Sequence, residues 1–93
     1  MDYNRLQRLS VYLLQYAKGK TCLVSFGIIH SIEEKNIIHN CWTDFGSAGS
    51  PILSSRNGKV IGVHYGYKSH NNNKLKLGTL LSFAILDFQK NKK

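Results

Sequence analysis

The segment from Gly46 to Gly66 carries the strongest structural signal in this chain. It begins Gly46-Ser47-Ala48-Gly49-Ser50-Pro51 and continues Ile52-Leu53-Ser54, a turn at Arg56-Asn57-Gly58, and Lys59-Val60-Ile61-Gly62-Val63-His64-Tyr65-Gly66. The small residues at the start allow a sharp backbone turn and close approach of other groups. The β-branched residues on both sides of the Asn-Gly turn are typical of paired strands. We therefore predict a small-residue loop followed by strands at 51–54 and 59–66.

Similar strand signals occur on both sides of this segment. Segments rich in β-branched and aromatic residues predict further strands at 11–16, 21–30, 36–41 and 75–81, with a polar loop at 67–74. Short strands with frequent turn signals predict an all-β fold, here a six-stranded antiparallel Greek-key barrel. From Ser82 onward, apolar residues at roughly helical spacing predict a C-terminal helix, formed by Phe83, Ile85, Leu86 and Phe88.

The length of 93 residues fits one domain. Residues 1–10 are polar and are interpreted as a lead-in or a linker remnant, and residues 11–93 as the barrel with its terminal helix. No stretch is apolar for long enough to span a membrane, and the N-terminus lacks a signal-peptide hydrophobic region, which favours an intracellular protein.

The loop around Ala48 resembles the nucleophile loop of trypsin-like serine proteases, Gly-x-Ser-Gly-x-Pro, with Ala48 in the position of the serine. The order of strand, Thr43, small-residue loop, short strand, Asn-Gly turn and Val-Ile-Gly-x-His is similar to the C-terminal barrel of that family. Its glutamyl-endopeptidase branch is the most similar. The resemblance spans roughly residues 11 to 88 and is densest between Ile38 and Gly66.

This resemblance implies a role for each residue of the site. The backbone N–H groups of Gly46 and Ala48 would form an oxyanion hole, and Thr43 and His64 would bind an acidic substrate side chain. Tyr65 and Gly66 would belong to the edge strand that pairs with an extended peptide. The implied activity is hydrolysis of peptide bonds after acidic residues, with the His and Asp of the triad on a first barrel that this chain lacks.

Three functions remain open on the sequence. If Ala48 is an introduced change, the chain is an inactive endopeptidase domain. If Ala48 is natural, the chain is a pseudo-protease that binds an acidic peptide or a partner protein. The net charge of +8 also allows a basic nucleic-acid binder, although no known nucleic-acid-binding pattern is present. Expected partners are a peptide or protein substrate and a missing first barrel or partner subunit, with a homodimer as a further option.

The two cysteines give no sign of a reactive or metal-binding site. Cys22 and Cys41 fall on predicted strands and are interpreted as free buried thiols, with a disulfide as the alternative. Neither has the spacing of a zinc site, and no metal or cofactor is predicted.

Overall fold

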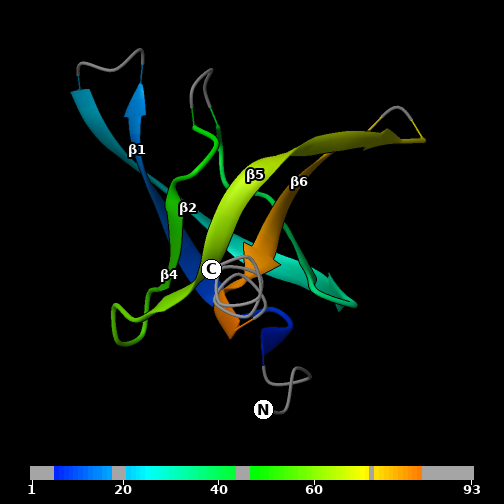
Figure 1. Ribbon diagram of the computed structural model, residues 1–93, viewed down its shortest axis with the longest axis horizontal. Helices are drawn as coiled ribbons and strands as arrows, with labels where there is room; N and C mark the ends of the chain where they lie inside the picture. The colour runs from blue at the N-terminus through cyan, green and yellow to red at the C-terminus, as the bar shows by residue number, and fades with distance from the viewer. Residues whose placement is uncertain (1–5, 18–20, 44–46, 72, 83–93) are drawn as a thin grey trace, which may run out of the picture.

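The computed structural model describes residues 6–17, 21–43, 47–71 and 73–82. In this part the chain is all-β and forms a closed antiparallel barrel (Figure 1). Its strands are β1 (Ser10–Ala17), β2 (Thr21–Glu33), β3 (Asn36–His39), β4 (Pro51–Ser54), β5 (Val60–His70) and β6 (Asn73–Leu80). The prediction of an all-β, six-stranded antiparallel barrel is confirmed.

The barrel closes through strands that are distant in sequence. Around the barrel the order is β1-β2-β3-β6-β5-β4, and β4 pairs with β1 to complete the circle. The chain therefore runs through three neighbouring strands and then crosses from β3 to β4, which lies beside β1. The first four strands thus have the spatial order 4-1-2-3.

Alternation along the strands places the apolar core inside the barrel. Successive side chains of a strand point to opposite faces, so Val11 and Leu13 of β1 point inward and Tyr12 does not. The fully buried cluster draws on all the strands except β5, together with the segment after β3: Val11, Leu13, Ile29, Ile37, Cys41, Ile52 and Leu80. Burying each large aliphatic side chain contributes about 1.5–3 kcal/mol, which makes this cluster the main support of the scaffold.

The predicted loop at 67–74 is wrong, because strands β5 and β6 continue through it. Paired residues extend from Gly66↔Leu77 to His70↔Asn73, and the hairpin reaches beyond the barrel (Figure 1). A strand exposed on both faces has no need of alternating apolar residues, so its polar sequence looks like a loop.

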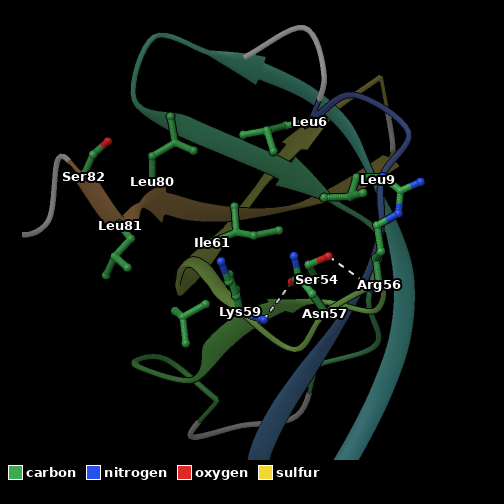
Figure 2. A pocket seen from close by; sticks show the side chains of 11 residues that line it. Leu6, Leu9, Ser54, Arg56, Asn57, Lys59, Ile61, Leu80, Leu81 and Ser82 are labelled. Carbon is green, nitrogen blue, oxygen red and sulfur yellow. Dashed lines mark hydrogen bonds between the residues drawn. The ribbon is translucent and has the colours of Figure 1, made fainter. Parts of the chain in front are cut away.

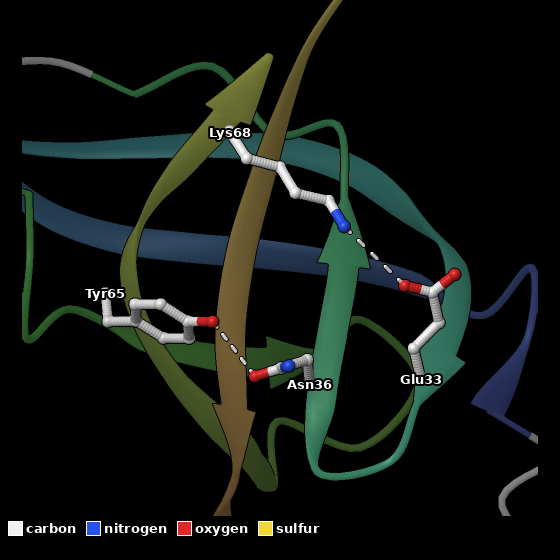
Figure 3. Close-up of polar contacts among 4 residues, drawn as sticks. All are labelled: Glu33, Asn36, Tyr65 and Lys68. Atoms are coloured by element: carbon white, nitrogen blue, oxygen red, sulfur yellow. Dashed lines mark hydrogen bonds and ion pairs between the residues drawn. The ribbon is translucent and has the colours of Figure 1, made fainter. Parts of the chain in front are cut away.

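Contacts with the β2–β3 turn region fasten the outer face of this hairpin. The hydroxyl of Tyr65 donates a hydrogen bond to Oδ1 of Asn36 at 2.9 Å, and Nζ of Lys68 lies 3.8 Å from Oε2 of Glu33 (Figure 3). Strand β2 also runs three residues past its predicted end, and β3 ends at His39, before the predicted end at residue 41. The helix expected from Ser82 falls on residues 83–93, which lie outside the described residues.

Both cysteines are free thiols, but they differ in exposure. Cys41 is buried, and burial raises the pKa of its thiol to about 11. Cys22 is exposed, contrary to the prediction of a buried thiol. It pairs with Tyr16 in the part of the β1–β2 hairpin that extends past the residues of β1 paired with β4.

We expect the fold to depend on the absence of a side chain at Gly62. An added Cβ would lie 2.3 Å from the carbonyl oxygen of Thr79 and 2.6 Å from Cδ1 of Ile37, so backbone would have to shift. Gly62→Ala should therefore lower the free energy of unfolding by about 2–3 kcal/mol, measured by urea denaturation. Gly66→Ala on the same strand is the matched control. No atom lies within 4 Å of its added Cβ, so a loss equal to that of Gly62→Ala would contradict the prediction.

Candidate functional site

The loop Ser47–Ser50 is fixed to strand β5 at one residue, His64. The N–H of Gly49 donates to the carbonyl of His64 at 2.7 Å, and the N–H of His64 donates to the carbonyl of Ser50 at 2.9 Å. Gly49 has φ of 93°, a left-handed conformation that glycine adopts without steric cost. The small residues of the sequence are thus used for a tight turn that brings the loop beside β5.

Within the loop, Ala48 and Gly49 are the residues presented to solvent. Ser47 and Ser50 are buried, whereas Ala48 is exposed. In the described part of the chain the N–H of Ala48 has no hydrogen-bond partner. Its amide is therefore free to donate to a ligand. Gly46, the other residue of the predicted oxyanion hole, lies outside the described residues.

A pair of buried histidines lies next to this loop. Nε2 of His39 on β3 lies 3.1 Å from Nδ1 of His64 on β5, and the two rings meet edge to face. The N–H of Cys41 donates to Nδ1 of His39 at 3.1 Å. Only 1% of His39 and 3% of His64 is exposed. The sequence interpretation singled out His64 but missed His39, which the alternation after the buried Ile37 would have placed inside the barrel.

The hydrogen bonds determine which nitrogen of each neutral ring carries its proton. A backbone N–H can only donate, so Nδ1 of His39 is an acceptor and the proton of a neutral His39 is on Nε2. That Nε2–H then donates to Nδ1 of His64. A neutral His64 consequently carries its own proton on Nε2, the ring nitrogen left to donate to a ligand.

Burial keeps both rings neutral at neutral pH. Desolvation, followed by the charges of His64 and Lys76, lowers the pKa of His39 from 6.5 to about 3. Desolvation and Lys76 also lower the pKa of His64. Lys76 is paired with His39 across β3 and β6 and brings a fixed positive charge to the site. Sequence reasoning missed this residue, because only the pairing of the strands places it here.

Thr43 and Tyr65, also predicted for the site, make no described hydrogen bond to the ring of His64. Thr43 is half-buried in the segment after β3, and the carbonyl of the preceding Trp42 accepts a hydrogen bond from Nε2 of Gln15 at 3.0 Å. In the described part of the chain no hydrogen bond joins Thr43 to His64. Tyr65 follows His64 directly, but its hydroxyl is held on the outer face by Asn36 (Figure 3).

Gly66 lies where β5 leaves its neighbour β4. The pairing of β4 with β5 ends at Val63, and Gly49 and Ser50 make the last described backbone contacts on this side, both at His64. From Gly66 onward, β5 pairs with β6 alone. In the described residues, its other edge therefore presents backbone groups without a strand partner, and the space above Gly66 is open.

Comparison with known proteins does not place the chain in a family: no family model matches it, and neither does any curated protein. In the described residues, no three His, Cys, Asp or Glu side chains gather where they could hold a metal ion. No helix in that part of the chain is long and apolar enough to cross a bilayer.

The buried histidines predict a loss of stability in acid. Their pKa values are lower in the folded chain than in the unfolded one, so the unfolded chain binds protons first as the pH falls below about 6.5. The stabilisation is complete above this pH and is lost as the pH falls towards the folded pKa, which is about 3 for His39. His39→Asn keeps an acceptor for the N–H of Cys41 but does not titrate. Between about pH 6.5 and about pH 4.5, the free energy of unfolding of the original chain should fall by about 2 kcal/mol more than that of this variant.

Urea denaturation across this pH range measures the effect, and groups common to both proteins cancel in the comparison. His30→Asn is the matched control, because His30 is exposed on β2. It should keep the pH dependence of the original chain. Equal pH dependence in the original chain and His39→Asn would show that His39 is not held neutral by burial.

Proposed function

We propose that this chain is the second barrel of a trypsin-like serine endopeptidase and that it binds an extended peptide through an acidic side chain. With serine at position 48 and a first barrel that carries His and Asp, such an enzyme would hydrolyse the bond after that acidic residue. As it stands, the chain binds without cutting. The 4-1-2-3 order of its first strands is that of a Greek key, which supports the proposal.

One observation carries the proposal: the two backbone hydrogen bonds between the Ser47–Ser50 loop and His64. They link the position expected to hold a nucleophile to the residue expected to select the substrate side chain. Strand β4 and the turn after it also join the two segments. These bonds extend the antiparallel pairing of β4 with β5 past Pro51 and Val63, and so hold the loop beside His64.

The chemistry around His64 suits a carboxylate. A neutral imidazole N–H can donate one hydrogen bond to it, and Lys76 supplies the positive charge that the neutral rings do not. Tyr67 and Lys76 are paired and so share a face of the hairpin, and Nζ of Lys74 lies 4.0 Å from the centre of the Tyr67 ring. This inner face of the hairpin extends the basic surface away from His64.

The free edge of β5 provides the means to hold a peptide backbone. Extended peptides bind exposed strand edges by main-chain hydrogen bonds, and neighbouring pockets select alternate side chains. The edge begins at Gly66, two residues after His64, so a peptide paired there would pass close to the histidine. The absence of a side chain at Gly66 leaves room for it.

Catalysis requires what this chain lacks. Alanine has no hydroxyl to attack a peptide bond. In subtilisin, losing the nucleophile of the triad lowers turnover on the order of a millionfold. A non-catalytic pseudo-protease would use the same binding surface. Cleavage by Ala48→Ser therefore separates the two versions of the proposal, and peptide binding is common to both.

The barrel that would supply His and Asp also needs a surface to pack on. The outer face of the β1–β2 hairpin carries Tyr12 and Phe26, whose ring centres lie 5.9 Å apart, next to Val24. Phe26 is 71% exposed and Val24 49%, which is unusual for large apolar side chains that lie together. We assign this face to the missing barrel. A second copy of the chain would instead appear as a homodimer in sedimentation equilibrium.

The proposed recognition predicts a preference for Glu over Gln in an otherwise identical extended peptide. We expect the Glu peptide to bind about ten times more tightly. A charge-assisted hydrogen bond contributes about 1.5–3 kcal/mol to binding, and solvent screening reduces this contribution. Fluorescence anisotropy of the labelled peptides measures both affinities. Lys76→Gln should abolish most of the preference, and Lys35→Gln, which removes an exposed charge from the β2–β3 turn, should leave it intact. Equal affinity for the two peptides in the original chain would refute carboxylate recognition.

A second prediction concerns the missing nucleophile. Ala48→Ser, joined to a first barrel bearing His and Asp from a glutamyl endopeptidase, should cleave a peptide after Glu and react with a fluorophosphonate. The same variant without that barrel should do neither, because its serine has no general base. The joined protein with Ala48 retained is the control. Absence of labelling in the joined Ala48→Ser protein, with peptide binding preserved, would favour the pseudo-protease.

A further inference from the structure

A cavity lies at the opposite end of strand β4 from the Ser47–Ser50 loop. It has a volume of about 510 Å³, within the range of small-molecule sites (Figure 2). Most of its lining is aliphatic and comes from the lead-in, β5 and the end of β6: Leu6, Leu9, Val60, Ile61, Leu80 and Leu81. The groove is therefore an apolar surface that shares no lining residue with the proposed peptide site.

Cationic side chains border this groove. Arg56 and Lys59 line it, and a shallower pocket of about 500 Å³ shares Leu9 and Arg56 with it and adds Arg8. No acidic residue lines either cavity in the described part of the chain. In that part, the side chains of Arg8 and Arg56 form no ion pair or hydrogen bond. The charges are thus available to a ligand.

The backbone beneath these cations is held in place by local hydrogen bonds. The N–H of Arg56 donates to Oγ of Ser54 at 3.2 Å, and the N–H of Lys59 donates to Oδ1 of Asn57 at 3.0 Å (Figure 2). The N–H of Arg8 donates to the carbonyl of Ile29 at 2.7 Å. Two separate segments therefore present arginines at fixed places beside one apolar groove.

We propose that this groove binds a medium-chain fatty acid. Its hydrocarbon chain lies along the aliphatic lining, and its carboxylate is bound by Arg56 with Arg8 beside it. Arginine suits this role because its planar guanidinium can donate two parallel hydrogen bonds to a carboxylate. The volume of about 510 Å³ is large enough for a single hydrocarbon chain. A second copy is disfavoured, because each chain carries a net charge of +8.

Decanoate tests the proposal on the full chain, with backbone amide chemical shifts as the readout. We expect saturable binding at one site, with the largest shifts at Leu9, Val60 and Leu81. Arg56→Gln should weaken decanoate at least tenfold, the equivalent of losing one charge-assisted hydrogen bond. Lys74→Gln, which removes a charge from the β5–β6 hairpin, should change the affinity less than twofold. Butanoate, which has the same carboxylate but little hydrocarbon, should bind far more weakly.

The neutral analogue 1-decanol separates the two parts of the site. It should bind more weakly than decanoate and be insensitive to Arg56→Gln, because it has no charge for the arginine to bind. Three results would overturn the proposal. One is an absence of saturable decanoate binding, as expected if residues 83–93 or another copy fill the groove. The second is a set of shifts confined to the β1–β2 face. The third is equal binding of decanoate and 1-decanol, with no effect of Arg56→Gln.

Discussion

Two hydrogen bonds between the backbone of His64 and the Ser47–Ser50 loop organise one end of the barrel. They fix where β4 begins, and β4 is the strand that closes the barrel against β1. They also hold the loop that carries the exposed Ala48 against the backbone of the buried His64. If the loop turned away, the start of β4 and the position of the candidate site would both change. The same two hydrogen bonds therefore determine both the closure of the barrel and the geometry of the site.

The interior polar groups are arranged so that burial does not leave a charge unpaired. His39 and His64 satisfy each other, and the amide of Cys41 occupies the remaining acceptor of His39. Because desolvation keeps both rings neutral, the positive charge of the site comes from Lys76, which is only half-buried. A site that places its charge at the rim and neutral donors inside can receive an anion without burying an isolated cation.

The strands of the barrel proper were predictable because they must bury one face. Residues 51–54 match β4, and the strand predicted at 59–66 falls within a residue of where β5 begins. The hairpin beyond Gly66 was missed because both of its faces meet solvent or polar groups, so its composition resembles that of a loop. Within the site, His64 was marked by its motif. Alternation along β3 marks His39 as inward-facing. Its contact with His64 and the position of Lys76, however, depend on pairing between strands that are far apart in sequence, and no local pattern records that pairing.

The positive charge of the chain acts at both ends of β4. The chain has thirteen basic and five acidic residues. In the described residues, Lys68 and Glu33 form the ion pair that is identified. The surplus field attracts anions to the whole molecule and cannot by itself choose between the two proposed sites. Choice comes from short-range chemistry: a strand edge with an imidazole N–H at one end, and an aliphatic groove with arginines at the other. Added salt screens the common field, so it should weaken a short acidic peptide more than a ligand that also buries a hydrocarbon chain.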